Sequence, residues 1–180
     1  MITNDINLII TNLKQNNTVS VPTDTVYGLS CAIDEMAVKK LIDIKKRDTS
    51  KGFIIISSNI NHLLKYINLL ELDQSHVEKI LEKTNEPTTW IAPAINSIKW
   101  LTGGQSTIAI RLVKSEAINH ITESLNNAII STSANISGTA TLLNISDIDS
   151  VFPHIYILKS DAISSKPSKI INLLTNHKMR

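Results

Sequence analysis

The chain has 180 residues, of which 42% are hydrophobic and 19% are charged, and its formal net charge is +2. The length fits one domain over residues 1–180, and the composition excludes an intrinsically disordered chain. The mild positive charge permits a nucleic-acid partner without requiring one. The sequence has no signal-peptide pattern and no apolar run of about 18 residues, so we expect a cytoplasmic protein that does not associate with membranes.

Hydrophobic periodicity predicts helices and strands that alternate along the chain. In the first half, the pattern predicts helix 4–15, strand 18–22, helix 35–46 capped by Asp34, strand 53–57, and helices 59–68 and 74–83. In the second half, it predicts strands 88–92 and 106–112, helix 115–125, strand 128–132, helix 147–152 capped by Ser146, and strands 154–158 and 169–174. This alternation predicts an α/β domain with one mixed sheet.

Two short polar loops each follow an apolar, strand-like run. The first is Pro22–Leu29, entered from Val19–Val21, and the second is Ser131–Gly138, entered from Ala128–Ile130. Small hydroxyl residues at strand ends place N–H and O–H groups where an anion can sit. Two such loops in one small domain predict a single site built from both.

The expected helix 35–46 ends in a group of cations. Helical spacing continues its apolar stripe to Lys45, so this side chain is expected to lean toward the sheet, and Arg47 and Lys51 follow. One interpretation is a lysine that keeps its charged head in water, beside cations favoured by the helix dipole. The other interpretation is a basic cluster that binds a polyphosphate.

The expected strand 106–112 carries an arginine among apolar residues. Alternation places Arg111 and Thr107 on the face opposite Ile108 and Ile110. An unpaired buried charge is costly, so Arg111 needs an anionic partner. A structural Asp or Glu would satisfy it, and a bound carboxylate or phosphate would satisfy its two-pronged guanidinium equally well.

Other signals are weaker. The five histidines lack metal-ligand spacing, and the sequence has no P-loop, GxGxxG or GxSxG motif. The single cysteine, Cys31, excludes an intramolecular disulfide and is expected to be a small buried residue rather than a nucleophile. Trp90 and Trp100 are expected to pack rather than to stack on bases. The residues alone therefore predict a cationic, hydroxyl-rich pocket for an anionic small molecule, without naming the reaction.

Four segments, in order along the chain, resemble the motifs of the YrdC-like threonylcarbamoyl-AMP synthases. They are Pro22–Leu29, Lys45-Lys46-Arg47, Ser106–Arg111 and Ser133–Gly138. The similarity runs from about residue 18 to about residue 175. The chain resembles the short form of the family, which the segments Lys51–Ile56 and Lys166-Pro167-Ser168 fit.

The resemblance implies a twisted, open, mixed sheet flanked by helices, with a concave and positively charged surface. It also implies that L-threonine, bicarbonate and ATP, accompanied by Mg²⁺, give threonylcarbamoyl-AMP and pyrophosphate. A downstream tRNA threonylcarbamoyl-transfer complex would use the product to make threonylcarbamoyladenosine at position 37 of tRNAs that read codons beginning with A. The amine and bicarbonate would form an N-carboxylate that attacks the α-phosphorus, so the protein would act by positioning and charge stabilisation.

The resemblance also implies roles for individual residues. Lys45 and Arg47 would be catalytic. The residues that would bind ATP are Lys45, Arg47, Lys51, Ser133, Asn135 and Thr141. The residues that would bind L-threonine are Thr25, Thr107, Arg111, Ser131 and Ser168, with Arg111 holding the carboxylate. No residue is assigned as a metal ligand.

The sequence departs from the family pattern at several positions. Ser30 stands where many members have glycine, and Lys51 stands where long-form members often have asparagine. Ile56 stands where some members have a histidine that contacts the substrate, and Glu86–Thr89 lacks a glycine. The contacts made by those family residues must be replaced or absent here.

Two other functions stay open. The first is an RNA-binding module in ribosome or tRNA biogenesis, which would use the basic concavity without catalysis. The second is a related domain that makes a carbamoyl adenylate from another donor, such as carbamoyl phosphate.

Overall fold

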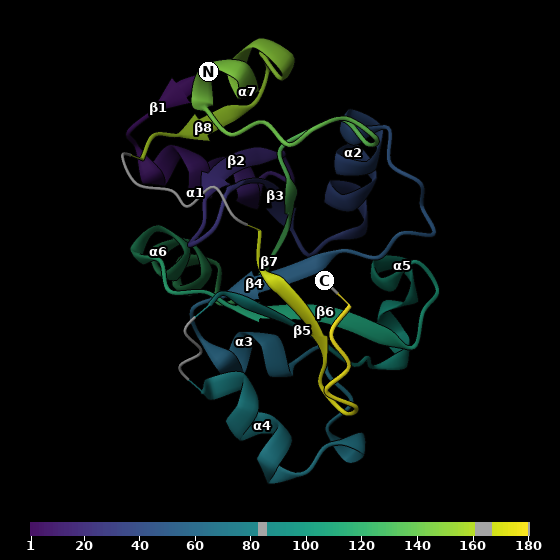
Figure 1. Ribbon diagram of the computed structural model, residues 1–180. Coiled ribbons are helices and arrows are strands. Elements are labelled where there is room, and N and C mark those ends of the chain that lie inside the picture. Colours follow the sequence, from purple (N-terminus) through teal and green to yellow (C-terminus); the bar gives the residue numbers. More distant parts are fainter. Residues whose placement is uncertain (83–85, 161–166, 180) are drawn as a thin grey trace.

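Nine strands form one mixed sheet in the computed structural model, which describes residues 1–82, 86–160 and 167–179 (Figure 1). The strands are β1 (Ile2–Thr3), β2 (Val19–Pro22), β3 (Tyr27–Ala32), β4 (Ile54–Ser57), β5 (Thr88–Pro93), β6 (Thr107–Leu112), β7 (Ile129–Ser133), β8 (Tyr156–Leu158) and β9 (Lys169–Asn172). Their order across the sheet is β1-β8-β2-β3-β7-β4-β6-β5-β9. The central strands β3, β7 and β4 pair antiparallel, whereas β4 and β6 pair parallel.

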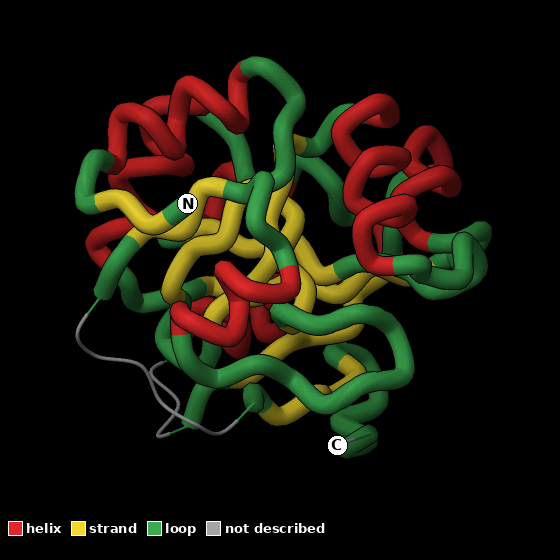
Figure 2. The backbone as a smooth tube through the Cα atoms, turned by 90° about the horizontal axis from the view of Figure 1, so that it is seen from above, coloured by secondary structure: helices red, strands yellow, loops and turns green. Residues whose placement is uncertain are grey.

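Helices lie around this sheet, with the strands running through the middle of the molecule (Figure 2). The helices are α1 (Ile6–Lys14), α2 (Glu35–Lys45), α3 (Ile60–Leu64), α4 (Gln74–Leu81), α5 (Lys99–Thr102), α6 (Glu116–Leu125) and α7 (Ile145–Val151), with 3₁₀ turns at Leu69–Glu71 and Asn96–Ile98. Within the described ranges, none of these helices has the length and apolar character needed to cross a membrane.

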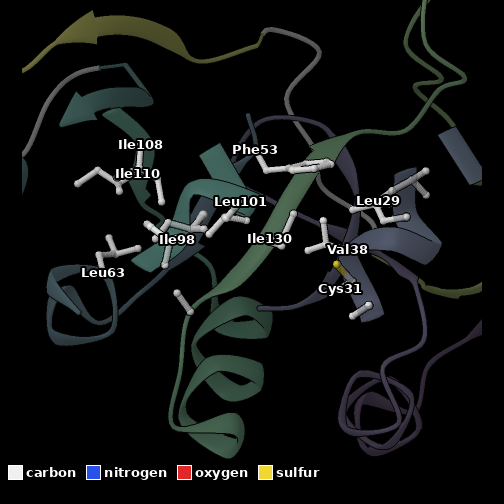
Figure 3. Packing of buried hydrophobic residues seen from close by; sticks show 14 of the residues in the cluster. Leu29, Cys31, Val38, Phe53, Leu63, Ile98, Leu101, Ile108, Ile110 and Ile130 are labelled. Atoms are coloured by element: carbon white, nitrogen blue, oxygen red, sulfur yellow. The ribbon is translucent and has the colours of Figure 1, made fainter. Parts of the chain in front are cut away.

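Two apolar cores, one on each face of the sheet, hold the layers together. The larger core joins α2, α3, α4, α5 and α7 to the sheet through residues such as Val38, Leu63 and Leu101, which belong to the same cluster as Ile130 of β7 (Figure 3). The smaller core joins α1 and α6 to β2, β4 and β7. Burial of such side chains contributes about 1.5–3 kcal/mol each relative to leaving them exposed, so both cores stabilise the sheet strongly.

The alternation of side chains along the central strands decides which face holds the site. On β4, Ile55 belongs to the larger core, whereas Ile56 belongs to the smaller one. On β6, Ile108 and Ile110 belong to the larger core, and Arg111 pairs in register with Ile56. Arg111 therefore lies on the face opposite Ile108 and Ile110, as the alternation predicted.

Most predicted elements are confirmed, with ends that shift by a few residues. Asp34 caps α2, since its Oδ1 accepts the N–H groups of Met36 and Ala37 at 2.9 and 3.2 Å. Trp90 belongs to the larger core, and Trp100 packs against it, as expected. The fold class is therefore the predicted one, and the positive charge of the concave surface stays a prediction.

Several boundaries were predicted wrongly. Residues Tyr27–Ala32 form β3 rather than the end of a loop, because Gly28 and Ser30 interrupt the apolar pattern that would have identified a strand. Likewise, the first residues of the predicted Ser131–Gly138 loop belong to β7. Ser146 does not cap α7; Asn144 does, because its Oδ1 accepts the N–H of Asp147 at 2.9 Å.

Four short elements escaped the sequence patterns. They are β1, α5 and the two 3₁₀ turns, and none is long enough to show a periodicity. Two predicted positions, Lys83 at the end of helix 74–83 and Lys166 in the late motif, lie outside the described residues.

Candidate functional site

A cavity of about 320 Å³ opens on the face of the sheet that carries Arg111. Its floor comes from the adjacent strands β3, β7, β4 and β6, and Pro167, Ser168 and Ile170 supply one wall. Of the residues predicted to bind substrates, seven line the cavity: Thr25, Arg47, Arg111, Ser131, Ser133, Thr141 and Ser168. Residues separated by more than 100 positions in the sequence therefore meet in one cavity.

The other four predicted residues do not line this cavity. Lys45 and Asn135 are buried, at 1% and 9% exposure, and contact each other. Lys51 is exposed in the segment that follows α2, and Thr107 is half-buried as the first residue of β6, paired with Pro93. The predicted site residues therefore fall into two groups, those that line the cavity and those that do not.

The floor depends on a close approach between β3 and β7. Gly28 lies opposite Ser133 in the antiparallel pair. A Cβ atom at position 28 would lie 2.4 Å from the Oγ of Ser131 and 3.3 Å from the carbonyl oxygen of Thr132. Because real atoms do not approach that closely, glycine at this position allows the Ser131 hydroxyl to stay at the cavity floor.

Arg111 is fixed in the cavity by the loop between β2 and β3. Its Nη1 donates to the Oγ1 of Thr25 at 3.1 Å, and its Nη2 forms an ion pair with the Oδ1 of Asp24 at 3.3 Å. The side chain is only 7% exposed, so these partners offset much of the cost of burying its charge. The structural carboxylate that the sequence left open is therefore present, and it is Asp24.

Thr23 fixes the conformation of this loop. Its Oγ1 donates to the carbonyl oxygen of Val26 at 2.8 Å and accepts the N–H of Thr25 at 3.2 Å. The hydroxyl groups of Thr23 and Thr25 are also 2.9 Å apart. A hydroxyl has a single proton. Because that of Thr23 is used on Val26, the Thr25 hydroxyl donates to Thr23 and accepts from Arg111.

Lys45 lies in a second polar cluster, under the loop that follows β7. Its Nζ donates to the carbonyl oxygens of Ser133 and Asn135, both at 2.6 Å, and to the Oδ1 of Asn135 at 3.2 Å. Burial, and to a smaller extent the charge of Arg47, lower the pKa of Lys45 to about 8. The prediction that Lys45 points toward the sheet is confirmed. The interpretation that it keeps its charged head in water is wrong, because the residue is 1% exposed.

The same loop is tied together by further hydrogen bonds. The Oγ of Ser133 donates to the Oδ1 of Asn135 at 2.6 Å, and the Nδ2 of Asn135 donates to the carbonyl oxygen of Thr139 at 2.7 Å. The N–H of Ser137 donates to the main-chain oxygen of Lys45 at 2.8 Å. Lys45 therefore contacts the loop through both its side chain and its backbone.

A tight turn after α2 separates the direction of Arg47 from that of Lys45. Lys46 adopts the left-handed conformation with φ of 50°, and the N–H of Arg47 returns to the carbonyl oxygen of Ile42 at 3.0 Å. Arg47 then lines the cavity, where its Nη2 donates to the carbonyl oxygen of Gly52 at 2.8 Å. Its guanidinium lies 4.7 Å from the centre of the Phe53 ring, and burial lowers its pKa.

Ser168 joins the site through the edge of the sheet. Its Oγ and the Oγ1 of Thr89 are 2.8 Å apart in a buried contact, and β9 continues from it in parallel with β5. Ile56 also lines the cavity, at the position where a family histidine was expected to be replaced. An apolar side chain therefore stands beside Arg111 in the floor.

Sequence reasoning missed Asp24 as a site residue. Its position next to Thr25 in the first motif was a signal, but its pairing with Arg111 spans 87 positions and depends on the fold. Cys31 is fully buried, and burial followed by the Asp34 carboxylate raises the pKa of its thiol, so it is the small buried residue that was expected.

Comparisons with known proteins find relatives over most of the chain. The family model for Sua5, YciO and YrdC proteins, described as telomere recombination, matches residues 11–180. A protein of Actinobacillus succinogenes named threonylcarbamoyl-AMP synthase is 34% identical over 172 residues, which cover 93% of this chain and 94% of that protein.

Solved structures of Sua5 from P. abyssi share the fold. One superimposes with a TM-score of 0.83 at 25% identity, covering 93% of this chain and 52% of the other. A second, complexed with L-threonine, gives a TM-score of 0.80 at 24% identity and covers 93% of this chain and 50% of the other. The present chain therefore spans about half the length of that Sua5 protein.

Proposed function

The chain belongs to the Sua5/YciO/YrdC family, and we propose that it is a threonylcarbamoyl-AMP synthase. The relatives' name specifies a product that joins threonine, a one-carbon carbonyl unit and AMP, which makes threonine and ATP the substrates. The observation that carries the proposal is a single cavity lined by two guanidinium groups, those of Arg111 and Arg47. Two cationic groups suit two anions, a carboxylate and a triphosphate.

Threonine is assigned to the part of the cavity around Arg111. The guanidinium holds the carboxylate, and the Thr25 hydroxyl beside it has its proton committed to Thr23, which leaves Thr25 an acceptor toward the amino acid. Ser131 and Ser168 add hydroxyl groups from β7 and from the segment before β9. Thr107 stays a predicted contact. It does not line the cavity, so the substrate would have to extend beyond the cavity to reach it.

ATP is assigned to the part of the cavity around Arg47. Arg47, Ser133 and Thr141 line it, and Lys51 is exposed nearby in sequence. Arg47 and Thr141 can donate to phosphates directly, whereas the Ser133 hydroxyl already donates to Asn135. Lys45 and Asn135 belong to this half through the loop that carries Ser133. Arg47 is well suited to the role because a guanidinium binds phosphate oxygens in pairs.

Mg²⁺ stays a prediction as the ion that accompanies ATP. Among the residues that the structure describes, no group of three or more His, Cys, Asp or Glu side chains lies together, so these residues do not form a metal site of their own. An ion carried by phosphates and water fits such a cavity, because Mg²⁺ keeps several waters and commonly binds substrate phosphates. When bound, it would supply charge neutralisation.

The geometry supports a mechanism of positioning rather than acid–base catalysis. The threonine amine bonds to the carbon of bicarbonate with loss of water, and a carbamate oxygen then attacks the α-phosphorus with departure of pyrophosphate. Holding two reactants in one cavity can supply about 7–11 kcal/mol of the barrier. Arg47 would stabilise the charge that develops on the phosphates.

The test is formation of the adenylate by the purified full chain. With ATP, Mg²⁺, L-threonine and ¹³C-bicarbonate, mass spectrometry should detect labelled threonylcarbamoyl-AMP together with pyrophosphate. Arg47→Ala should lose most turnover, whereas Lys39→Ala, which removes an exposed lysine from α2, should keep it. A folded wild-type protein that makes no adenylate would overturn the proposal.

The same assay separates the alternatives. An RNA-binding module would make no adenylate and would show RNA affinity that falls steeply with salt and ignores ATP with threonine. Product formed only when carbamoyl phosphate replaces threonine and bicarbonate would indicate the other adenylate. The tRNA-modifying partner complex, direct RNA binding and a cytoplasmic location stay predictions from the sequence.

A further inference from the structure

We propose that Lys45 is a positioning residue that does not bind the phosphates of ATP itself but fixes the loop Ser133–Thr139, which begins in the cavity wall at Ser133. This role rests on the proposed function and refines it. It differs from the sequence-based expectation that Lys45 contacts ATP, although the residue stays essential for the ATP half of the site.

All three donors of the Lys45 ammonium are used within the protein. A lysine ammonium has three N–H groups and no acceptor. The Nζ of Lys45 has three acceptors at hydrogen-bond distance: the carbonyl oxygens of Ser133 and Asn135 at 2.6 Å, and the Oδ1 of Asn135 at 3.2 Å. Every donor therefore has a protein acceptor, and a phosphate could bind only by displacing one of them.

The Lys45 side chain also lies outside the cavity lining. Lys45 is 1% exposed and does not line the cavity, whereas Arg47, two positions later, does. The left-handed turn at Lys46 sends these two cations in different directions. For Lys45 to touch a ligand in the cavity, the loop above it would have to move.

The Lys45 ammonium holds a loop that begins in the cavity wall. Ser133 lines the cavity, and both its carbonyl oxygen and its hydroxyl belong to the network around Lys45 and Asn135. Asn135 carries the network on to Thr139, and Ser137 returns to the backbone of Lys45. The described partners of the ammonium are neutral oxygens rather than carboxylates, so its charge also makes the loop cationic toward an approaching phosphate.

A mutant cycle tests this role. ATP affinity would be measured by calorimetry with Mg²⁺ for Lys45→Met, Asn135→Ala and the double variant. If Lys45 acts through the loop, each single change weakens ATP at least tenfold, and the double variant is no more than about twofold weaker than the worse single one. If the double variant instead loses ATP affinity by the product of the two single losses, the proposal is overturned, because a direct contact of Lys45 with phosphate would add to the contribution of the loop.

Two further variants serve as controls for this double-mutant cycle. Arg47→Ala removes a residue of the cavity wall, so its loss should multiply with that of Asn135→Ala. Lys39→Met removes an exposed lysine of α2 and should leave ATP affinity unchanged. Lys45→Met should also raise the KM for ATP while leaving the KM for threonine near its wild-type value, whereas general damage to the fold would raise both.

A spectroscopic measurement on the wild-type protein does not depend on whether a variant folds. The ¹⁵N resonance of the Lys45 ammonium should be visible and protected from exchange with water, and ATP should leave its hydrogen bonds to carbonyl oxygens in place. Rapid exchange in the free protein, or loss of those bonds on addition of ATP, would overturn the proposal. Absence of adenylate formation by the wild type would overturn the proposed function and leave this reading of the free protein intact.

Discussion

Two buried cations, Arg111 and Lys45, differ in their relation to the cavity. Both are nearly inaccessible, at 6% and 1% exposure, and both were predicted from an interruption in an apolar pattern. Arg111 meets a carboxylate and a hydroxyl group and lines the cavity, whereas Lys45 meets carbonyl and amide oxygens and does not. Burial and charge alone therefore do not distinguish a residue that meets the ligand from one that supports the site.

The difference follows from the chemistry of the two side chains. The guanidinium of Arg111 is planar, has five N–H donors and lines the cavity, where it can meet a carboxylate in two places. An ammonium has three donors, and three protein acceptors satisfy it completely. Whether a buried cation lines the cavity thus indicates its role better than its accessibility does.

The largest effect is expected when Arg111 is replaced by lysine, the residue type at position 45. Arg111→Lys should raise the KM for threonine by roughly 30- to 150-fold, equivalent to about 2–3 kcal/mol, because one ammonium cannot replace a two-pronged contact. The affinity for ATP, measured separately, should change little. A threonine KM close to that of the wild type would show that Arg111 does not bind the threonine carboxylate.

A second change tests the Asp24 carboxylate, which pairs with Arg111, whereas Lys45 contacts carbonyl and amide oxygens. Asp24→Asn should raise the KM for threonine roughly tenfold, since the neutral amide holds the Nη2 of Arg111 less firmly than the carboxylate does. Asp24→Glu restores the charge and is the matched control. Equal losses in both variants would show that the shape of the loop, rather than the ion pair, matters.

The pH dependence of ATP binding tests the second cation. The pKa of Lys45 is lowered to about 8, so raising the pH through this value converts the charged ammonium into a neutral amine with one donor fewer. ATP affinity should therefore be highest below pH 8 and should fall by up to about tenfold per pH unit above it. In Lys45→Met, calorimetry should show no such fall; the same fall in that variant would assign it to another group.

A smaller effect is expected at the strand contact under both halves of the cavity. Gly28→Ala should reduce stability by about 1 kcal/mol and raise the KM for threonine a few-fold, because the new Cβ forces the Ser131 hydroxyl to move. Thermal unfolding and steady-state kinetics check both. The double variant with Ser131→Ala should regain part of the lost stability, and a failure to do so would place the clash elsewhere.

The sequence predicted those parts of the fold that depend on local patterns. The cap at Asp34, the inward direction of Lys45 and the face occupied by Arg111 all follow from spacing within one helix or strand. The partners of these side chains could not be predicted in the same way. The acceptors of Lys45 lie up to 90 positions away, so only the folded sheet brings them together.

Local patterns also failed where two choices were equally good. Asn144 and Ser146 are both suitable cap residues, and the structure uses the first. In β3, Gly28 helps to hide a strand because the close approach to β7 leaves no room for a side chain at this position. A residue of the cavity floor, Gly28, thus made the strand harder to identify.

The left-handed turn at Lys46 places stability and activity in conflict at one position. A residue with a Cβ in this conformation costs about 1–2 kcal/mol relative to glycine, so Lys46→Gly should raise the thermal unfolding midpoint. That change would also remove a charge between two cations of the ATP half. A library selected only for heat resistance should therefore enrich glycine at position 46, and one selected for turnover at low ATP would reveal whether the lysine is retained for its charge.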